Sequence, residues 1–320
     1  MRRRLAARLW QSLVVVLIVT TISFVLIRVA PGDPFSYEFT TVSPAIQAQW
    51  RHQFGYDRPI PEQFVRYLAS IAHGEFGYSV MRREPVAAVL AEVVPRTLLL
   101  TGLSLALSLV LGIIIGVLQA THRDGWFDRV SSGFLLTLYS LPDFWGAMMI
   151  AFVFAYWWQL LPTAGLVDPA LHEFMAPWPA AVDRLRHLVL PVASLTLLSM
   201  AGITRFQRAA LLEILPADYI RTARAKGVAE SAVVWRHALR TALAPMIVLL
   251  GVMLPALLGG ALFVERVFQW PGMGYTAALA IDAHDYDVVT AVVVVGSVMV
   301  VVGNLVADVL HAAIDPRVRE

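Results

Sequence analysis

The sequence predicts an all-α integral membrane protein with six membrane-spanning helices. Hydrophobic residues make up 58% of the 320 positions and charged residues only 15%, whereas a soluble domain carries roughly 25% charged residues. The mean hydropathy is correspondingly high, at +0.67. The apolar residues also form runs of about 20, the length that an α-helix needs to cross the hydrocarbon core of a bilayer.

Six apolar segments are long enough to be spans. The first follows a basic start but is longer than the apolar region of a signal peptide, so we expect it to be retained. The third is interrupted by Pro142-Asp143, and the fourth is short and continues into Arg205 and Arg208. The segments are Leu9–Ile27, Leu98–Leu118, Ser131–Leu160, Leu188–Thr204, Met246–Val264 and Val288–Ala307.

Basic residues flank the spans unevenly, which predicts the orientation. Cytoplasmic loops carry an excess of arginine and lysine. With both termini in the cytoplasm, the two short outer loops hold only Arg184, Arg186 and Arg266. The protein is therefore expected in the cell (inner) membrane as a multi-pass protein. The inner side then holds Arg2, Arg3, Arg4, Arg8, Arg123, Arg129, the seven bases from Arg205 to Arg240, Arg317 and Arg319.

The long outer segment between the first two spans is expected to form a small helical cap. Pro31-Gly32-Asp33-Pro34 ends the first span, since proline lacks the backbone donor that a helix needs. Pro61–Ile71 and Glu84–Val94 are both amphipathic at helical spacing, so each predicts a short helix over the outer mouth. The chain thus divides into residues 1–96, the first span with this outer segment, and residues 97–315, a core of five spans with a polar loop at 211–245.

Asp218–Pro245 is a polar, basic island between two spans. Asp218 stands where a helix N-cap belongs, and Gly227 where a helix-ending residue with positive φ belongs. A second helix fits Ala229–Ala242. Its predicted apolar side consists of Val233, Val234, His237 and Ala238.

Two interpretations of the island stay open on the pattern alone. Arg221 and Arg224 are i,i+3 neighbours on the first helix, and the small residues Ala223, Ala225 and Gly227 would let the backbone of another protein come close. The island would then be a docking site. Alternatively, it is a basic juxtamembrane helix that rests on anionic lipid.

The island resembles the signature cytoplasmic loop of ATP-binding-cassette importer permeases. Aligned on Gly227, Arg221-Thr222-Ala223 take the Glu-Ala-Ala positions of that loop, and His237-Ala238-Leu239-Arg240 take its Ile-x-Leu-Pro positions. This variant is similar to the B-type permeases of dipeptide and oligopeptide importers, in the binding-protein-dependent transport system permease family. Many such permeases carry proline where this chain has Asp287, a departure at the outer mouth. Further matches are Pro31-Gly32-Asp33-Pro34, Phe268-x-Trp270-Pro271-Gly272-x-Gly274, Asp285-Tyr286, Asn304-Leu305 and Asp315-Pro316-Arg317.

The resemblance implies partners and a set of coupling residues. The partners are a second, similar permease subunit, two cytoplasmic ATPase subunits, an extracytoplasmic substrate-binding protein and the lipid bilayer. Small peptides are the implied cargo, with nickel complexes, glutathione or another small solute as alternatives on the same scaffold. The implied ATPase-coupling loop contains Asp218, Arg221, Thr222, Ala223, Arg224, Ala225, Lys226, Gly227 and His237.

The chain contains no motif for nucleotide chemistry. A P-loop needs Gly-x-x-x-x-Gly-Lys-Ser/Thr, and the one lysine, Lys226, stands in Arg-Ala-Lys-Gly. We therefore expect no catalytic residue, no metal and no cofactor on this chain, with ATP and Mg bound by the partner ATPases. Nucleic acid is not an expected partner, because the bases lie beside apolar spans rather than along one face.

A second group of residues is predicted at the transport pathway or its gate. Asp143 would lie about a dozen residues, or ~18 Å, into the third span, where a carboxylate suggests function. The alternative is that it accepts backbone donors where Pro142 breaks the helix. The segment with Phe268, Trp270, Pro271, Gly272 and Gly274 would form a turn beside the pathway.

Two other classes of protein remain as alternatives. An intramembrane hydrolase is disfavoured, because Ala176 replaces the second histidine of a His-Glu-x-x-His motif that would start at His172. An ion-coupled secondary transporter is disfavoured because the two halves show no sequence repeat. The outer histidines His73, His172, His187 and His284 are expected to be scattered surface residues.

Overall fold

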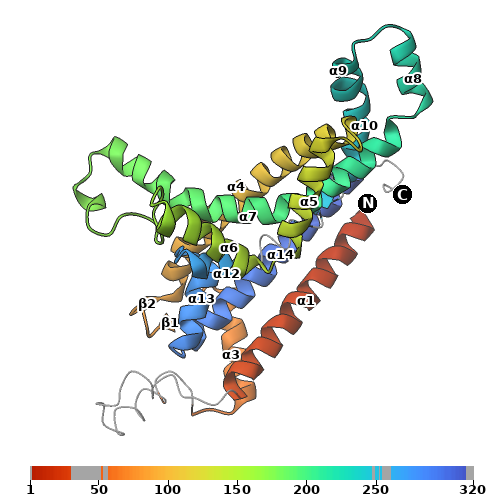
Figure 1. Cartoon of the computed structure of the whole chain (residues 1–320). Helices are drawn as coiled ribbons and strands as arrows, with labels where there is room; N and C mark the ends of the chain where they lie inside the picture. Colours follow the sequence, from red (N-terminus) through yellow and green to blue (C-terminus); the bar gives the residue numbers. More distant parts are fainter. Residues whose placement is uncertain are drawn as a thin grey trace. The chain divides into compact units, whose positions relative to one another are not determined.

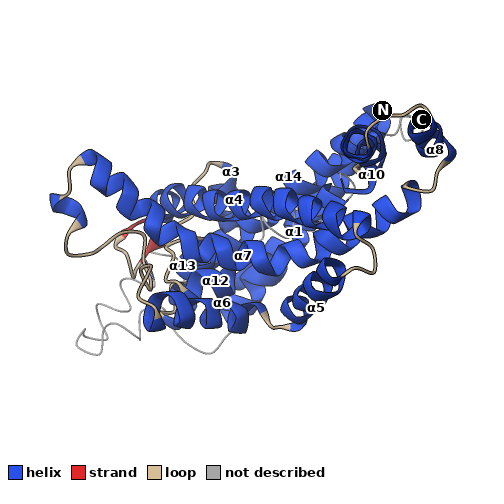
Figure 2. Ribbon diagram, turned by 45° about the horizontal axis from the view of Figure 1, so that its top comes forward, coloured by secondary structure: helices blue, strands red, loops and turns tan. Residues whose placement is uncertain are grey.

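The computed structural model describes residues 2–29, 52, 57–246, 249–251, 253 and 261–314. Helices make up most of this part of the chain, with one two-stranded hairpin (Figures 1 and 2). The contacts divide the chain into two compact units. Unit 1 is Met1–Thr97 with Pro271–Val301, and unit 2 is Leu98–Trp270 with Val302–Glu320.

Unit 1 begins with α1 (Arg2–Val29), which packs against α3 (Ile60–Ala72). The buried ring of Phe24 lies 5.3 Å from the ring centroids of both Phe64 and Tyr67. The sequence predicts a helix at Pro61–Ile71, and α3 confirms it. The Pro31–Pro34 turn lies outside the described residues.

The first turns of α4 (Val86–Thr121) form the core of unit 1 with α13 (Met273–Asp282) and α14 (Tyr286–Ile314). The predicted apolar face is confirmed, because Val86, Val89, Leu90 and Val93 are all buried. The expectation of a separate short helix at Glu84–Val94 is wrong. The helix continues through Pro95 into the second span, since packing of this face offsets the hydrogen bond that the proline removes.

A hairpin of β1 (Tyr78–Ser79) and β2 (Glu84–Pro85) is tied to the start of α14. Asp285 Oδ2 accepts hydrogen bonds from Ser79 Oγ (2.6 Å) and from the Met81 amide (3.1 Å). Asp287 Oδ2 accepts a hydrogen bond from the Tyr78 amide (3.2 Å). The residue before Tyr78 is Gly77, whose φ is +91°. Asp287, which stands where many similar permeases carry proline, thus has a hydrogen-bond partner in the hairpin.

Unit 2 is built around the close approach of α4 to α7 (Pro177–Ile214). Gly112 and Gly116 lie one turn apart on α4. A Cβ at Gly112 would stand 2.7 Å from Ile203 Cγ2, and one at Gly116 would stand 2.9 Å from the Thr204 carbonyl oxygen. Small residues at this spacing let two membrane helices approach closely. Ser108 Oγ also donates across the interface to the Thr196 carbonyl (3.3 Å).

The predicted third span is not one straight helix. α5 (Trp126–Ser140) ends before Pro142, and α6 (Asp143–Ala151) starts after it and continues as a π-helical segment, Phe152–Trp157. The bend between the two arms is 111°. Proline breaks the helix because it lacks the N–H donor and restricts the residue before it.

Three helices in the described part of the chain are long and apolar enough to cross a membrane: α4, α7 and Tyr286–Val309 of α14. The number rises to five if the bent pairs Trp126–Ser140 with Asp143–Trp157 and Glu230–Ala242 with Ala244–Gly251 each count as one span. α1 contributes a shorter apolar helix, Trp10–Leu26. Part of the predicted fifth span lies outside the described residues.

Candidate functional site: the polar loop

The polar loop (residues 211–245) begins with the last turn of α7 and continues into a short helix, α8 (Asp218–Ala225). Ala217 occupies the N-cap position and no side chain caps the helix, so the predicted N-cap at Asp218 is wrong. Asp218 is the first helical residue instead. Its carboxylate lies 3.6 Å from Arg221, and its carbonyl accepts a hydrogen bond from Thr222 Oγ1 (2.9 Å). An acidic residue in the first turn still stabilises the helix through its interaction with the helix dipole.

Gly227 ends this helix as the sequence predicts. Its φ is +77°, the left-handed conformation that glycine adopts without strain. No atom lies within 4 Å of the position of an added Cβ. The requirement for glycine at this turn is therefore one of backbone conformation and not of space.

The second helix runs over Glu230–Ala242, close to the predicted Ala229–Ala242. Its middle, Val233–Ala238, is π-helical. The guanidinium of Arg224 joins the two helices through paired hydrogen bonds to Glu230, at 3.0 and 2.7 Å. These hydrogen bonds raise the pKa of Arg224 and lower the pKa of Glu230, because each group stabilises the charged form of the other.

One side of the loop packs onto the ends of two long helices. Ile220 of α8 is fully buried, and Val233, Val234 and Ala238 of the second helix are buried with it. Their cluster includes Val117 and Ala120 of α4 and Leu211 of α7. The loop is therefore anchored to α4 and α7 by an apolar core and projects beyond them (Figure 1).

The other side of the loop is open. Arg221, Thr222, Arg224, Ala225, Lys226 and Gly227 are exposed, and Ala223 is half-buried. Tyr219 and Trp235 add exposed aromatic surface that the sequence analysis did not single out. His237, predicted on the apolar side, is exposed. Positions 233, 234 and 238 form the buried face of this segment, and His237 lies outside that face.

The predicted pathway residues are divided between the two units. Asp143 is exposed at the start of α6 and accepts no hydrogen bond from the residues that the structure describes. The helix breaks directly before Asp143, at the Pro142-Asp143 interruption that the sequence predicts. Phe268 and Trp270 are almost completely buried in two apolar clusters of unit 2. Pro271, Gly272 and Gly274 belong to unit 1, with both glycines buried.

Two of the four histidines that are expected outside the membrane are not scattered surface residues. Nδ1 of His172 lies 2.7 Å from Asp183 Oδ2, and Nδ1 of His187 lies 3.2 Å from Asp183 Oδ1. Asp183 also accepts a hydrogen bond from the Asp168 amide (3.0 Å). The i,i+4 spacing of Asp183 and His187 could have indicated one contact from the sequence. No group of three acidic or histidine side chains is placed to hold a metal in the described part of the chain.

The long apolar helices and the anchored polar loop define a multi-pass membrane protein. The family comparison is more specific. The chain matches the model of the binding-protein-dependent transport system inner membrane component over residues 108–320, and the N-terminal model of the same component over residues 1–101. The chain belongs to this family.

Relatives match along nearly the whole chain. The oligopeptide transport system permease protein AppB of Bacillus subtilis (strain 168) is 36% identical over 316 residues, covering 97% of each chain. The dipeptide transport system permease protein DppB of Escherichia coli (strain K12) is 34% identical over 321 residues, covering 94% of each. The glutathione transport system permease protein GsiC of Escherichia coli O1:K1 / APEC is 35% identical over 306 residues, again covering 94% of each.

Proposed function

We propose that this chain forms half of the translocation path of an ATP-binding-cassette importer for small peptides. A second, similar permease subunit would form the other half, two ATPase subunits would bind on the cytoplasmic side, and a substrate-binding protein would deliver cargo outside. ATP-driven closure of the ATPases would move the polar loop, and the cavity between the permeases would change the side to which it opens. Membership of a binding-protein-dependent transport family supports this assembly.

The observation that carries the proposal is the two-sided polar loop. Its buried side is fixed to α4 and α7 through Ile220, and its exposed side presents Arg221, Arg224 and Lys226. A force on the exposed side therefore reaches two membrane helices without an intervening flexible segment. We assign coupling to Asp218, Arg221, Thr222, Ala223, Arg224, Ala225, Lys226, Gly227 and His237.

The remaining architecture follows from the proposal. The chain would cross the membrane six times with both termini in the cytoplasm and an outer cap between the first two spans. Residues 1–96 would be the N-terminal region and residues 97–315 the permease core. The transport pathway or its gate is assigned to Asp143, Phe268, Trp270, Pro271, Gly272 and Gly274.

Peptide cargo is supported by the relatives that are named for oligopeptide and dipeptide transport. Glutathione, itself a small peptide, is a second candidate because one relative is named for it. Nickel complexes remain a further alternative on the same scaffold. The chain itself would hold no cofactor, and hydrolysis of ATP with Mg would take place on the partner subunits. Uptake driven by an ion gradient without ATP, or hydrolysis by the chain alone, would instead indicate a secondary transporter or an intramembrane enzyme.

The first prediction tests coupling at Gly227. Gly227→Val should lower peptide uptake at least tenfold in the reconstituted transporter while ATP hydrolysis continues, because a β-branched residue resists positive φ. Gly227→Asn is the matched control, since asparagine adopts this conformation more readily and the site has space for a side chain. It should retain most of the coupling. Normal uptake by the valine variant would contradict the proposed role of the turn.

A further inference from the structure

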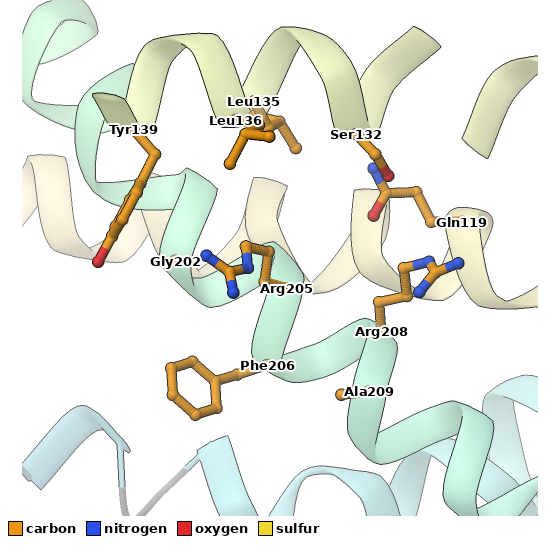
Figure 3. A pocket seen from close by; sticks show the side chains of 10 residues that line it. All are labelled: Gln119, Ser132, Leu135, Leu136, Tyr139, Gly202, Arg205, Phe206, Arg208 and Ala209. Atoms are coloured by element: carbon orange, nitrogen blue, oxygen red, sulfur yellow. The ribbon is translucent and has the colours of Figure 1, made fainter. Parts of the chain in front are cut away.

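We propose that a pocket between α4, α5 and α7 binds the phosphate group of an anionic glycerophospholipid, held by Arg205. The pocket lies within unit 2 and has a volume of about 680 Å³. Its walls include Gln119 of α4, Leu136 and Tyr139 of α5, and Arg205 and Phe206 of α7 (Figure 3).

The two arginines of the pocket differ in what they bind. Arg208 donates two hydrogen bonds to Asp128, at 2.9 and 2.8 Å, so its charge is neutralised within the protein. Arg205 is exposed and forms no ion pair with any residue that the structure describes. Its guanidinium carbon lies 5.7 Å from the ring centroid of Tyr139, an arrangement that orients the cation but leaves its charge uncompensated.

The surface around Arg205 is apolar. Leu136, Tyr139 and Phe206 are 55%, 58% and 57% exposed. In water, so many open apolar side chains around one cation would be unfavourable. A membrane lipid satisfies both features, because its phosphate pairs with the guanidinium and its acyl chains cover the apolar side chains.

The position of Arg205 along α7 agrees with a headgroup. It directly follows the apolar stretch Leu188–Thr204, and the ion pair of Arg208 with Asp128 lies one turn further along. Arg205 therefore stands where the hydrocarbon core gives way to headgroups. Basic pockets between membrane helices at this level bind anionic lipid headgroups, and the planar guanidinium can donate two parallel hydrogen bonds to a phosphate. The inference rests on membrane insertion of this family and not on the proposed cargo or coupling.

The test is lipid binding to the full chain, purified without lipid in a neutral detergent. Native mass spectrometry would compare phosphatidylglycerol with phosphatidylcholine of the same acyl chains. We expect Arg205→Gln to weaken the binding of phosphatidylglycerol about tenfold, because a charge-assisted hydrogen bond is lost, with little change for phosphatidylcholine. Arg184→Gln is the matched control. It removes the same charge from an exposed position on the same helix, outside the pocket, and should bind as the original chain does.

Three results would overturn the proposal. Equal affinity of Arg205→Gln and the original chain for phosphatidylglycerol would exclude Arg205 as the ligand. Displacement of the lipid by millimolar inorganic phosphate would indicate a small-anion site without acyl-chain contacts. Efficient photocrosslinking from a benzophenone amino acid at position 139 to the second permease in the assembled transporter would make the pocket a subunit interface. Because no ATPase is present in the binding assay, its outcome is independent of the coupling test at Gly227.

Discussion

At the residue scale, two glycines on α4 set how closely that helix approaches α7. Gly112 and Gly116 face the side chain of Ile203 and the carbonyl of Thr204, at distances that leave no space for a methyl group. Gly102, on the same helix, has no atom within 4 Å of an added Cβ. Glycine is therefore needed for helix packing at positions 112 and 116, whereas it has no packing role at position 102.

This contrast gives a prediction for stability. Gly116→Ala should lower the free energy of unfolding by about 1–3 kcal/mol, because the new methyl group forces the backbones apart. Gly102→Ala should be neutral or slightly stabilising, since alanine favours a helix more than glycine does. The thermal midpoint of each variant in detergent would measure the difference. Equal midpoints would show that α4 can move away from α7 at no cost.

At the scale of elements, Asp183 fixes the segment before α7 onto that helix. Its two carboxylate oxygens contact His172 and His187, and it also accepts the Asp168 amide. The 3-10 turn at His172–Phe174 is thus connected to α7 through one buried side chain.

Replacing Asp183 should therefore loosen a defined segment. We expect Asp183→Asn to cost about 1–3 kcal/mol of local stability, since the buried hydrogen-bonding groups lose part of their acceptor. Amide hydrogen exchange over residues 165–175 should accelerate roughly tenfold or more. Glu173→Gln is the control, because Glu173 is exposed in the same segment. Unchanged exchange in Asp183→Asn would mean that the segment is held by other contacts.

Local patterns predicted some of these elements and could not predict others. The apolar faces of α3 and early α4 follow from helical spacing, and Gly227 from its place after a polar helix. The contact of Ser79 with Asp285 joins residues far apart in the sequence, so no local pattern reveals it. The N-cap was assigned one residue late, because an acidic side chain suits either the cap or the first turn.

The third span shows a different limit. Pro142 indicated a break within the apolar run, but composition alone does not give the angle between the two arms. The structure places Asp143 at the start of α6, directly after the break that Pro142 predicts. Likewise, the sequence shows Arg205 and Arg208 as neighbours on one helix and gives no sign that their contacts differ. Their different roles depend on Asp128 of α5, which pairs with one of them and not with the other.

At the scale of the whole molecule, a single lysine allows the proposed orientation to be tested. Lys226 is exposed at the tip of the polar loop. A membrane-impermeant amine reagent should label this lysine in inside-out vesicles and leave it unlabelled in intact spheroplasts, with the site identified by peptide mass spectrometry. Lys226→Arg provides the control for labelling elsewhere. Labelling of Lys226 from the outside would place the loop on the wrong side for an ATPase and overturn the proposed function.

The unbroken length of α7 has a consequence for the direction in which information can travel. At about 1.5 Å per residue its 38 residues extend ~57 Å, well beyond the ~30 Å of hydrocarbon in a bilayer. The carboxylate of Asp183, in contact with His172, lies near one end of the helix. Leu211, which packs in the same apolar cluster as Ile220 of α8, lies near the other. A rigid helix of this length would carry a displacement from either end to the other. A protein that contacts the segment near Asp183 and a protein that contacts the polar loop would therefore act on the same helix.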